Sequence, residues 1–209
     1  MIDSKCKICR RAGQKLFLKG ERCYTPKCAI VKRPYSPGKK GKRRVSSLSE
    51  YGKELREKQR LKNWYNLKES QLKKYIKVVL KRRGKAEDPV NILIKRLESR
   101  LDNVVFQMGF AKSRPQARQF ISHGHFLINE KKINIPSYQL RQGDKIRLNP
   151  QKAQRKIFQN ISQSLKKQKL PSWLKLDIEK LEGEIVGGPS IQDVSLPIEI
   201  PAVFEFYSR

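Results

Sequence analysis

All four cysteines of the chain lie within its first 28 residues, as Cys6, Cys9, Cys23 and Cys28. Two residues separate the first pair, four separate the second, and thirteen lie between Cys9 and Cys23. Close cysteine pairs let a tight turn aim two sulfur atoms at one ion, and this spacing is typical of structural zinc sites. We therefore expect one structural Zn²⁺ per chain, bound by the four cysteines.

Other states of these cysteines remain open. An iron–sulfur cluster is the second metal hypothesis, because four cysteines serve both kinds of site. Two disulfides, or four unligated thiols, are the alternatives without metal. The first residues lack the apolar core of a signal peptide, which leads us to expect a soluble cytosolic protein whose reducing surroundings disfavour disulfides. A metal with four protein ligands activates no water, so the expected site is structural.

Positive charge dominates the composition. The 209 residues include 48 Lys and Arg against 19 Asp and Glu, giving a net charge of +29. Such self-repulsion argues against an ordinary metabolic enzyme and favours a polyanionic partner such as nucleic acid. No run approaches the roughly 18 apolar residues of a membrane span. Binding to an anionic membrane surface is a weaker alternative, because no amphipathic helix with aromatic anchors is evident.

The charge is unevenly distributed along the chain. Residues 1–45 carry a net charge of +13, residues 46–169 carry +20, and residues 170–209 carry −4. The stretch 32–45 combines prolines and glycines with a dense basic run, which predicts an extended arm that orders on phosphates; a solvated linker is the alternative. The acidic, apolar tail is the candidate segment for protein contacts or for capping the fold.

Hydrophobic periodicity predicts an α+β protein. Helices are expected over 47–62, with a Ser47–Glu50 capping box, then over 68–83, 89–108 and 114–122, with Ser113 and Gln116 at the start of the last. A hairpin over 126–135 and a strand over 145–148 should follow, then a basic helix over 151–169 and short strands. Trp64 and Tyr65 are expected in the core, and the aromatic C-terminus should dock on an apolar surface.

These elements suggest three parts. Residues 1–45 form the zinc-stapled basic arm, with a four-cysteine zinc knuckle at its start. Residues 46–93 and 150–209 form a helical body with a C-terminal tail. Residues 94–149 form an inserted module of two helices plus a small antiparallel sheet. The start of the 114–122 helix carries several cations beside free backbone amides, which is a good arrangement for binding phosphate.

The module also has the residues of a known family. The run from Arg96 to Gln119, RLESRLDNVVFQMGFAKSRPQARQ, followed by SHGH at 122–125 and NIPSY at 134–138, resembles the RNA-binding domain of the universal small-subunit ribosomal protein four family. The resemblance extends to CKICRR at 6–11, KGERCY at 19–24, SEYGK at 49–53 and LREKQ at 55–59. Nearly the whole chain is similar to the zinc-containing bacterial form.

The resemblance implies a structural constituent of the small ribosomal subunit in the cytoplasm. It implies a primary assembly protein that binds a junction in the 5′ domain of small-subunit rRNA and neighbours ribosomal protein five. It also implies a place near the mRNA entry channel and an influence on translational accuracy. It gives no reason to expect a functional homo-oligomer or a membrane partner.

Junction RNA is held through phosphate, ribose and shape rather than by reading bases in a deep groove. The polar and basic residues expected to contact RNA are Lys39, Lys40, Lys42, Arg43, Arg44, Arg56, Lys58, Arg60, Lys112, Ser113, Arg114, Gln116, Arg118, Gln119, Ser122, His123, Gly124, His125, Lys131 and Lys132. For His123 and His125, a structural turn with one ring packed is an equal alternative.

Two other functions compete with this interpretation. The same module looks like that of pseudouridine synthases and tyrosyl-tRNA synthetases, and Arg100-Leu101-Asp102 is similar to the synthase catalytic triplet. However, Asn103-Val104-Val105 replaces the expected continuation, and no catalytic domain of suitable size follows. A DNA-binding zinc protein is the third hypothesis, but no finger with paired histidines or dimerising heptad is present. We therefore expect no enzymatic activity.

Overall fold

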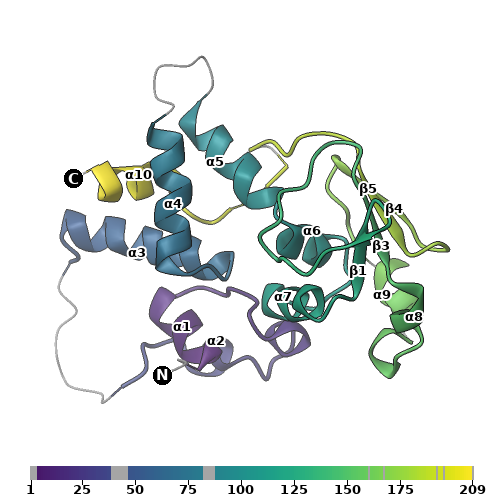
Figure 1. The fold of residues 1–209 in the computed structure, drawn as a ribbon. Helices are drawn as coiled ribbons and strands as arrows, with labels where there is room; N and C mark the ends of the chain where they lie inside the picture. Colours follow the sequence, from purple (N-terminus) through teal and green to yellow (C-terminus); the bar gives the residue numbers. More distant parts are fainter. Residues whose placement is uncertain are drawn as a thin grey trace. The chain divides into compact units, whose positions relative to one another are not determined.

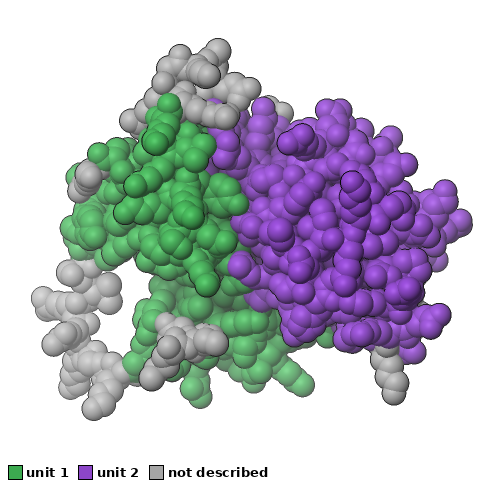
Figure 2. Space-filling view, in the orientation of Figure 1, with its two compact units in different colours: residues 1–90, 196–209 green, residues 91–195 purple. Residues whose placement is uncertain are grey.

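The computed structural model describes residues 4–38, 47–81, 88–159, 161–166, 168–191, 193–194 and 196–208. It divides the chain into two compact units (Figure 2). Unit 1 comprises residues 1–90 and 196–209, and unit 2 comprises residues 91–195. Each unit is described by itself below. No helix in the described part of the chain has the length and apolar composition needed to cross a bilayer.

Unit 1 is helical (Figure 1). It contains α1 (Lys5–Ala12), a 3₁₀ turn (Gly20–Cys23), α2 (Ala29–Lys32), α3 (Glu50–Trp64), α4 (Glu69–Leu80) and α10 (Ile200–Ser208). Helix α3 begins later than expected, because the Ser49 hydroxyl, not that of Ser47, accepts a hydrogen bond from the Gly52 amide at 3.2 Å. Helix α4 ends at Leu80, while Arg83 and Gly84 lie outside the described residues.

The C-terminal residues form a helix that the sequence patterns did not indicate. Helix α10 packs along α3 and also touches α4, burying Ile200, Val203 and Phe204. Its aromatic end docks within unit 1, with the Phe206 and Tyr51 rings 5.5 Å apart. The aromatic terminus was expected to dock on an apolar surface, and the structure shows it packed against α3 and α4; Tyr65, at 2% exposure, is a core residue as expected.

Unit 2 is the α+β part of the chain. It holds α5 (Pro89–Glu98) from Asn91 onward, then α6 (Leu101–Gln107), α7 (Arg114–Ser122), β1 (Phe126–Ile128), β2 (Lys131–Lys132) and β3 (Lys145–Leu148). Short helices α8 (Pro150–Ala153) and α9 (Ile161–Lys166) flank a 3₁₀ turn at Lys156–Phe158, and β4 (Leu174–Asp177) and β5 (Glu182–Ile185) follow. The strands form one antiparallel sheet in the order β2-β1-β3-β5-β4.

The β1–β2 hairpin follows from its turn residues. Ile128 pairs with Lys131, leaving Asn129 and Glu130 as a two-residue loop in which both φ angles are positive, at 47° and 64°. That conformation matches the right-handed twist of the flanking strands, and asparagine adopts it more readily than most residues. The expected hairpin is present, but its turn was misplaced: the sequence pattern put the turn at 130–132 and the second strand at 133–135, whereas the second strand is Lys131–Lys132.

Three expectations about unit 2 are wrong. The single helix expected over 89–108 is two helices, because Arg100 is extended, at φ −71° and ψ 137°, and forms a β-bridge with Gln139. The basic helix expected over 151–169 is broken into short pieces. The stretch that follows does not return to the helical body: β4 and β5 complete the sheet, so unit 2 extends to residue 195 rather than 149.

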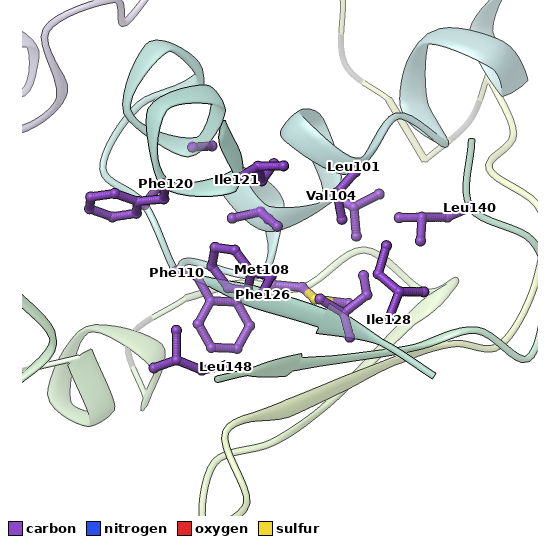
Figure 3. Packing of buried hydrophobic residues seen from close by; sticks show 14 of the residues in the cluster. Leu101, Val104, Met108, Phe110, Phe120, Ile121, Phe126, Ile128, Leu140 and Leu148 are labelled. Carbon is purple, nitrogen blue, oxygen red and sulfur yellow. The ribbon is translucent and has the colours of Figure 1, made fainter. Parts of the chain in front are cut away.

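The core of unit 2 lies where α6 and α7 cover the sheet (Figure 3). Figure 3 shows Met108 among Phe110, Phe126 and the residues of α6 and α7. Gly183 of β5 makes this packing possible, because a Cβ at that position would collide with the Met108 Sδ and Cε atoms. A strand glycine here marks a close approach of a side chain to the backbone.

Replacing Gly183 with alanine should destabilise unit 2 by about 1–3 kcal/mol, because an added methyl overpacks a filled core. Urea unfolding followed by the tryptophan fluorescence of Trp173 and Trp64 would measure the change. Gly188→Ala is the matched control, since a Cβ there meets no atom within 4 Å. Equal stabilities of the two variants would contradict this account of the Met108 packing.

Candidate nucleic-acid interface

A buried ion pair lies at the break between α5 and α6. Arg100 is fully buried, and its Nε and Nη2 atoms donate to the two Asp102 carboxylate oxygens at 3.0 and 2.6 Å. The backbone beside it is tied to a distant loop, since the Leu101 amide donates to the Tyr138 carbonyl at 2.9 Å. The Asp102 carboxylate also lies 4.0 Å from Nη1 of Arg118 on α7. One carboxylate thus fixes a buried arginine and orients a partly exposed one.

A second polar chain joins α5, α6 and α7. Buried Glu98 accepts hydrogen bonds from Asn103 Nδ2, at 2.7 Å, and from Gln107 Nε2. Asn103 Oδ1 in turn accepts from Arg114 Nε at 2.8 Å, and the Arg114 guanidinium lies 4.6 Å from the Phe106 ring centre. These hydrogen bonds give partners to polar side chains that would be costly to bury without them.

This second chain corrects the expected role of two residues. Arg114 is 8% exposed and Ser113 is 5% exposed, so neither presents its side chain to a ligand. Arg114 anchors α7 to α6 instead. The Ser113 side chain does not cap α7 as expected; the Gln116 Oε1 atom accepts a hydrogen bond from the Lys112 amide at 2.9 Å.

The remaining predicted residues of unit 2 include a solvent-facing set. Helix α7 begins with Pro115 in its first turn and buries Ala117, Phe120 and Ile121, which turns the opposite side outward. The exposed side chains are those of Lys112, Gln119, Ser122, His123, Lys131 and Lys132, while Gln116 and Arg118 are half-buried. The α7 surface and the β1–β2 hairpin therefore supply cations and hydrogen-bond donors to solvent.

The two histidines have different surroundings. His123 is exposed at the end of α7, whereas His125 is 2% exposed and packs between the Phe120 and Phe158 rings, at 5.7 and 5.3 Å. Burial lowers the pKa of His125, and the charges of Lys152, Arg155 and His123 lower it further. Of the two alternatives for these residues, packing holds for His125. Gly124 between them is also buried, with a positive φ of 64°.

Two cations near these histidines were missed in the sequence. Lys152 donates from Nζ to the His123 carbonyl, and Arg155 is exposed one turn further on. Helix α8 is brought back to this place because the Asn149 amide donates to the His125 carbonyl at 2.8 Å, and Asn149 caps α8 with its own side chain. A long regular helix would have carried these cations away, so the expectation of one helix over 151–169 concealed them.

In unit 1, three predicted RNA contacts serve the fold. Lys58 is 6% exposed, with its Nζ 2.9 Å from Glu69 Oε1 and 4.3 Å from the Phe206 ring centre, so its expected contact with phosphate is incorrect. Arg60 donates to the Ala12 carbonyl at 3.1 Å and pairs with Glu57. Arg56 is exposed and reaches the same carbonyl at 3.5 Å. The basic arm residues Lys39, Lys40, Lys42, Arg43 and Arg44 lie outside the described residues.

The four cysteines line one small cavity of about 10 Å³ in unit 1. Burial raises the pKa of the Cys9 thiol, the neighbouring Cys23, Cys6 and Cys28 add to this, and a hydrogen bond with the Leu16 backbone opposes it. None of the four forms a disulfide. Among the described residues, no three His, Cys, Asp or Glu side chains are grouped closely enough to hold a metal ion. The cysteines thus share a cavity without meeting the spacing of a closed metal site.

The geometry defines a class of protein. A small helix–helix–sheet module turns cations and polar side chains toward solvent, while a second, helical unit keeps many of its own cations in internal contacts. An outward surface of that kind suits a polyanion rather than a small molecule.

Comparisons with known proteins identify the family. Residues 1–97 match the family described as ribosomal protein S4/S9 N-terminal domain, and residues 99–146 match the S4 domain. The chain is 44% identical over 205 residues to small ribosomal subunit protein uS4 of Thermotoga maritima, covering 98% of this chain and 96% of that one. It is 42% identical over 207 residues to the protein of that name from Ruminiclostridium cellulolyticum, covering 99% and 98%. The chain belongs to the uS4 family.

Family membership decides between the rival functions. The uS4 proteins are structural ribosomal proteins, so the chain is not an RNA-modifying enzyme. Asp102, which resembles a synthase catalytic aspartate in the sequence, instead pairs with buried Arg100. Its carboxylate is therefore occupied in holding the module together.

The stability of unit 2 should decrease as the pH falls from 7 to 5. The pKa of His125 is lowered in the folded protein from its ordinary 6.5, so below pH 6.5 the unfolded chain takes up the proton first and is favoured. Urea unfolding at several pH values would measure this loss. The carboxylates with shifted pKa values, Glu69 and Asp193, lose their contribution only at lower pH.

His125→Phe should remove most of this pH dependence, because the new ring fills the space between Phe120 and Phe158 without titrating. His123→Gln is the control and should retain the slope, since His123 is exposed. An identical slope in the His125 variant and the wild type would contradict the assignment.

Proposed function

We propose that the chain is an rRNA-binding structural component of the small ribosomal subunit. The observation that carries this proposal is the outward cation surface of α7 and the β1–β2 hairpin, within a chain of the uS4 family. From Asn103 to Leu176 the sequence contains only two acidic residues, Glu130 and Asp144. Because cations greatly outnumber carboxylates in this part of the chain, the surface retains positive charge for phosphates.

The shape of the surface favours folded RNA over a regular duplex. Its donors come from two elements, and the Arg118 guanidinium lies 4.0 Å from the Asp102 carboxylate. Guanidinium groups oriented in advance suit phosphates brought together by a bent backbone, whereas the deep groove of an RNA helix is closed to side chains. A junction in the 5′ domain of small-subunit rRNA, which the family resemblance implies, is the target we propose.

The same resemblance supports the finer assignments that we propose. These are a role as a primary assembly protein, a place near the mRNA entry channel, and a neighbour in ribosomal protein five. Unit 1 has a groove of about 610 Å³ between α3 and α10, whose charged lining residues are Glu50, Lys53, Glu54, Arg56, Glu57, Glu199 and Glu205. Because carboxylates outnumber cations there, this groove is the surface we propose for a basic protein neighbour.

We also propose that Cys6, Cys9, Cys23 and Cys28 hold one structural zinc ion. Four thiols line one cavity of about 10 Å³, and thiolates are the donors that structural zinc prefers. Closing the sulfurs onto zinc would tie α1, the 3₁₀ turn and the start of α2 together. This region buries few apolar residues, chiefly Leu16, Leu18 and Ala12, so a metal would contribute much of its stability.

The purified protein should bind a transcript of the 5′ domain of small-subunit rRNA selectively over duplex DNA and unrelated RNA at fixed moderate salt. Filter binding with these competitors would measure the selectivity, and filter binding over a range of salt concentrations would measure the salt dependence. Each phosphate contact contributes about 0.7–0.9 to the slope of log affinity against log salt, so Lys112→Gln and Lys131→Gln should each reduce the slope by about that amount. Equal affinity for every competitor would show that the protein binds only as a general polycation and would contradict the proposed selectivity.

The protein should contain about one zinc ion per chain. Metal analysis together with thiol titration would count both, because the chain has no cysteine beyond these four. Chelation should raise hydrogen exchange in α1 and α2 and leave unit 2 protected, and Cys9→Ser should reproduce that pattern. A protein with four freely titratable thiols and unchanged exchange would show that the site is not a metal site.

A further inference from the structure

Three cations converge on the C-terminal end of α7 from three places in the sequence. Lys132 comes from β2, Lys152 from α8, and Arg155 from the turn after α8. The Lys132 stem lies against Gly124, whose missing side chain leaves room for it. Lys152 donates to the His123 carbonyl. We call Lys132, Lys152 and Arg155 the α7-end cluster.

The cluster has no carboxylate to neutralise it. None of the ion pairs within the described part of the chain involves any of its three members, and the nearest acidic residue in sequence, Glu130, lies 3.7 Å from Arg147 instead. The pKa of Lys152 is lowered by desolvation and by the charges of Lys132 and Arg155. The cations therefore repel one another in the free protein, and a bound anion would reduce that repulsion.

The end of α7 explains how the cluster is held together without an acid. The last carbonyls of a helix lack partners within the helix and carry partial negative charge, which favours cations. The Lys152 ammonium donates a hydrogen bond to the carbonyl of His123, the residue that caps the C-terminal end of α7. A carbonyl offsets less charge than a carboxylate does, so the cluster keeps most of its charge for a ligand.

We propose that the α7-end cluster is a phosphate-binding site that takes a phosphodiester of the RNA backbone. This inference rests on the proposed function and extends it, because Lys152 and Arg155 lie beyond residue 146, where the match to the S4 domain ends. The RNA surface of unit 2 thus continues from α7 and the hairpin onto the segment that follows the domain. The RNA backbone passes over the end of α7 and contacts α8.

The test compares two triple variants with equal loss of charge. Lys132→Gln, Lys152→Gln and Arg155→Gln together remove the cluster. Lys145→Gln, Lys175→Gln and Lys180→Gln together form the control, because these lysines lie beside Glu182, Glu184 and Asp177 on the β3–β5–β4 part of the sheet. Both variants are full-length chains, and their thermal unfolding is measured first.

Salt-dependent binding to the 5′-domain transcript should separate them. The cluster variant should lose about 1 unit of the salt slope and bind about tenfold more weakly at low salt, because the phosphate held by the three cations is no longer neutralised. The control variant should stay near the wild type. Equal losses in both variants, or wild-type binding by the cluster variant, would overturn the inference. Failure of the wild type to select this RNA would instead overturn the proposed function.

The two histidines provide a readout that does not depend on the variants. They are the only histidines in the chain, and their ring centres lie 6.2 Å apart beside the cluster. In proton NMR, adding the RNA should move both imidazole signals and shift the pKa of His125 upward, because a bound phosphate offsets Lys152 and Arg155. Inorganic phosphate at millimolar concentration should cause only a weak shift. Saturation by inorganic phosphate with no response to RNA would assign the site to free phosphate and overturn the RNA assignment.

Discussion

The arrangement of unit 2 depends on the buried contact between Arg100 and Asp102. A fully buried guanidinium is tolerated only where a carboxylate meets it in good geometry, and two parallel hydrogen bonds provide that. Extending the backbone at Arg100 ends α5, starts α6 and forms a β-bridge opposite Gln139, in which the Leu101 amide donates to the Tyr138 carbonyl and the Leu140 amide to the Ser99 carbonyl. The Asp102 oxygen that accepts from Arg100 Nη2 also lies 4.0 Å from Nη1 of Arg118. Asp102 therefore adds a charge contact between α6 and α7 to the apolar core that joins them.

The cations of the chain divide into two groups with opposite roles. Lys58, Arg100 and Arg114 are buried and matched by Glu69, Asp102 and Asn103, so their charge or hydrogen bonds serve the fold. Lys112, Lys131, Lys132 and Arg155 are exposed and Lys152 is half-buried, so these cations supply positive charge at the surface. A net charge of +29 therefore overstates the number of side chains available to RNA. Burial and pairing, not charge alone, decide which cations bind.

The sequence predicts elements whose signals are local. The α7 helix was predicted from a Ser113–Gln116 capping box and the β1–β2 hairpin from its apolar runs, and both elements are present, although Ser113 makes no cap and the turn lies at Asn129–Glu130 rather than at 130–132. The break at Arg100 was missed because the apolar stripe continues across it, and only a distant partner, Gln139, reveals the extended backbone. The burial of Arg114 and Lys58 likewise depends on contacts made through folding. Strands β4 and β5 could not be assigned to unit 2 from the sequence, because the alternation of residues in a strand does not show which strand it pairs with.

The cluster at the end of α7 also bears on the cost of binding RNA. Long cationic side chains lose rotamer freedom when they close on a phosphate, and that loss weakens binding. Here Lys152 is already held by the His123 carbonyl, and the stem of Lys132 already lies on Gly124. Part of the ordering is therefore complete in the free protein, where a helix end opposes the mutual repulsion of the cations. A phosphate entering this site replaces that repulsion with attraction, at less entropic cost than it would meet on a freely rotating lysine.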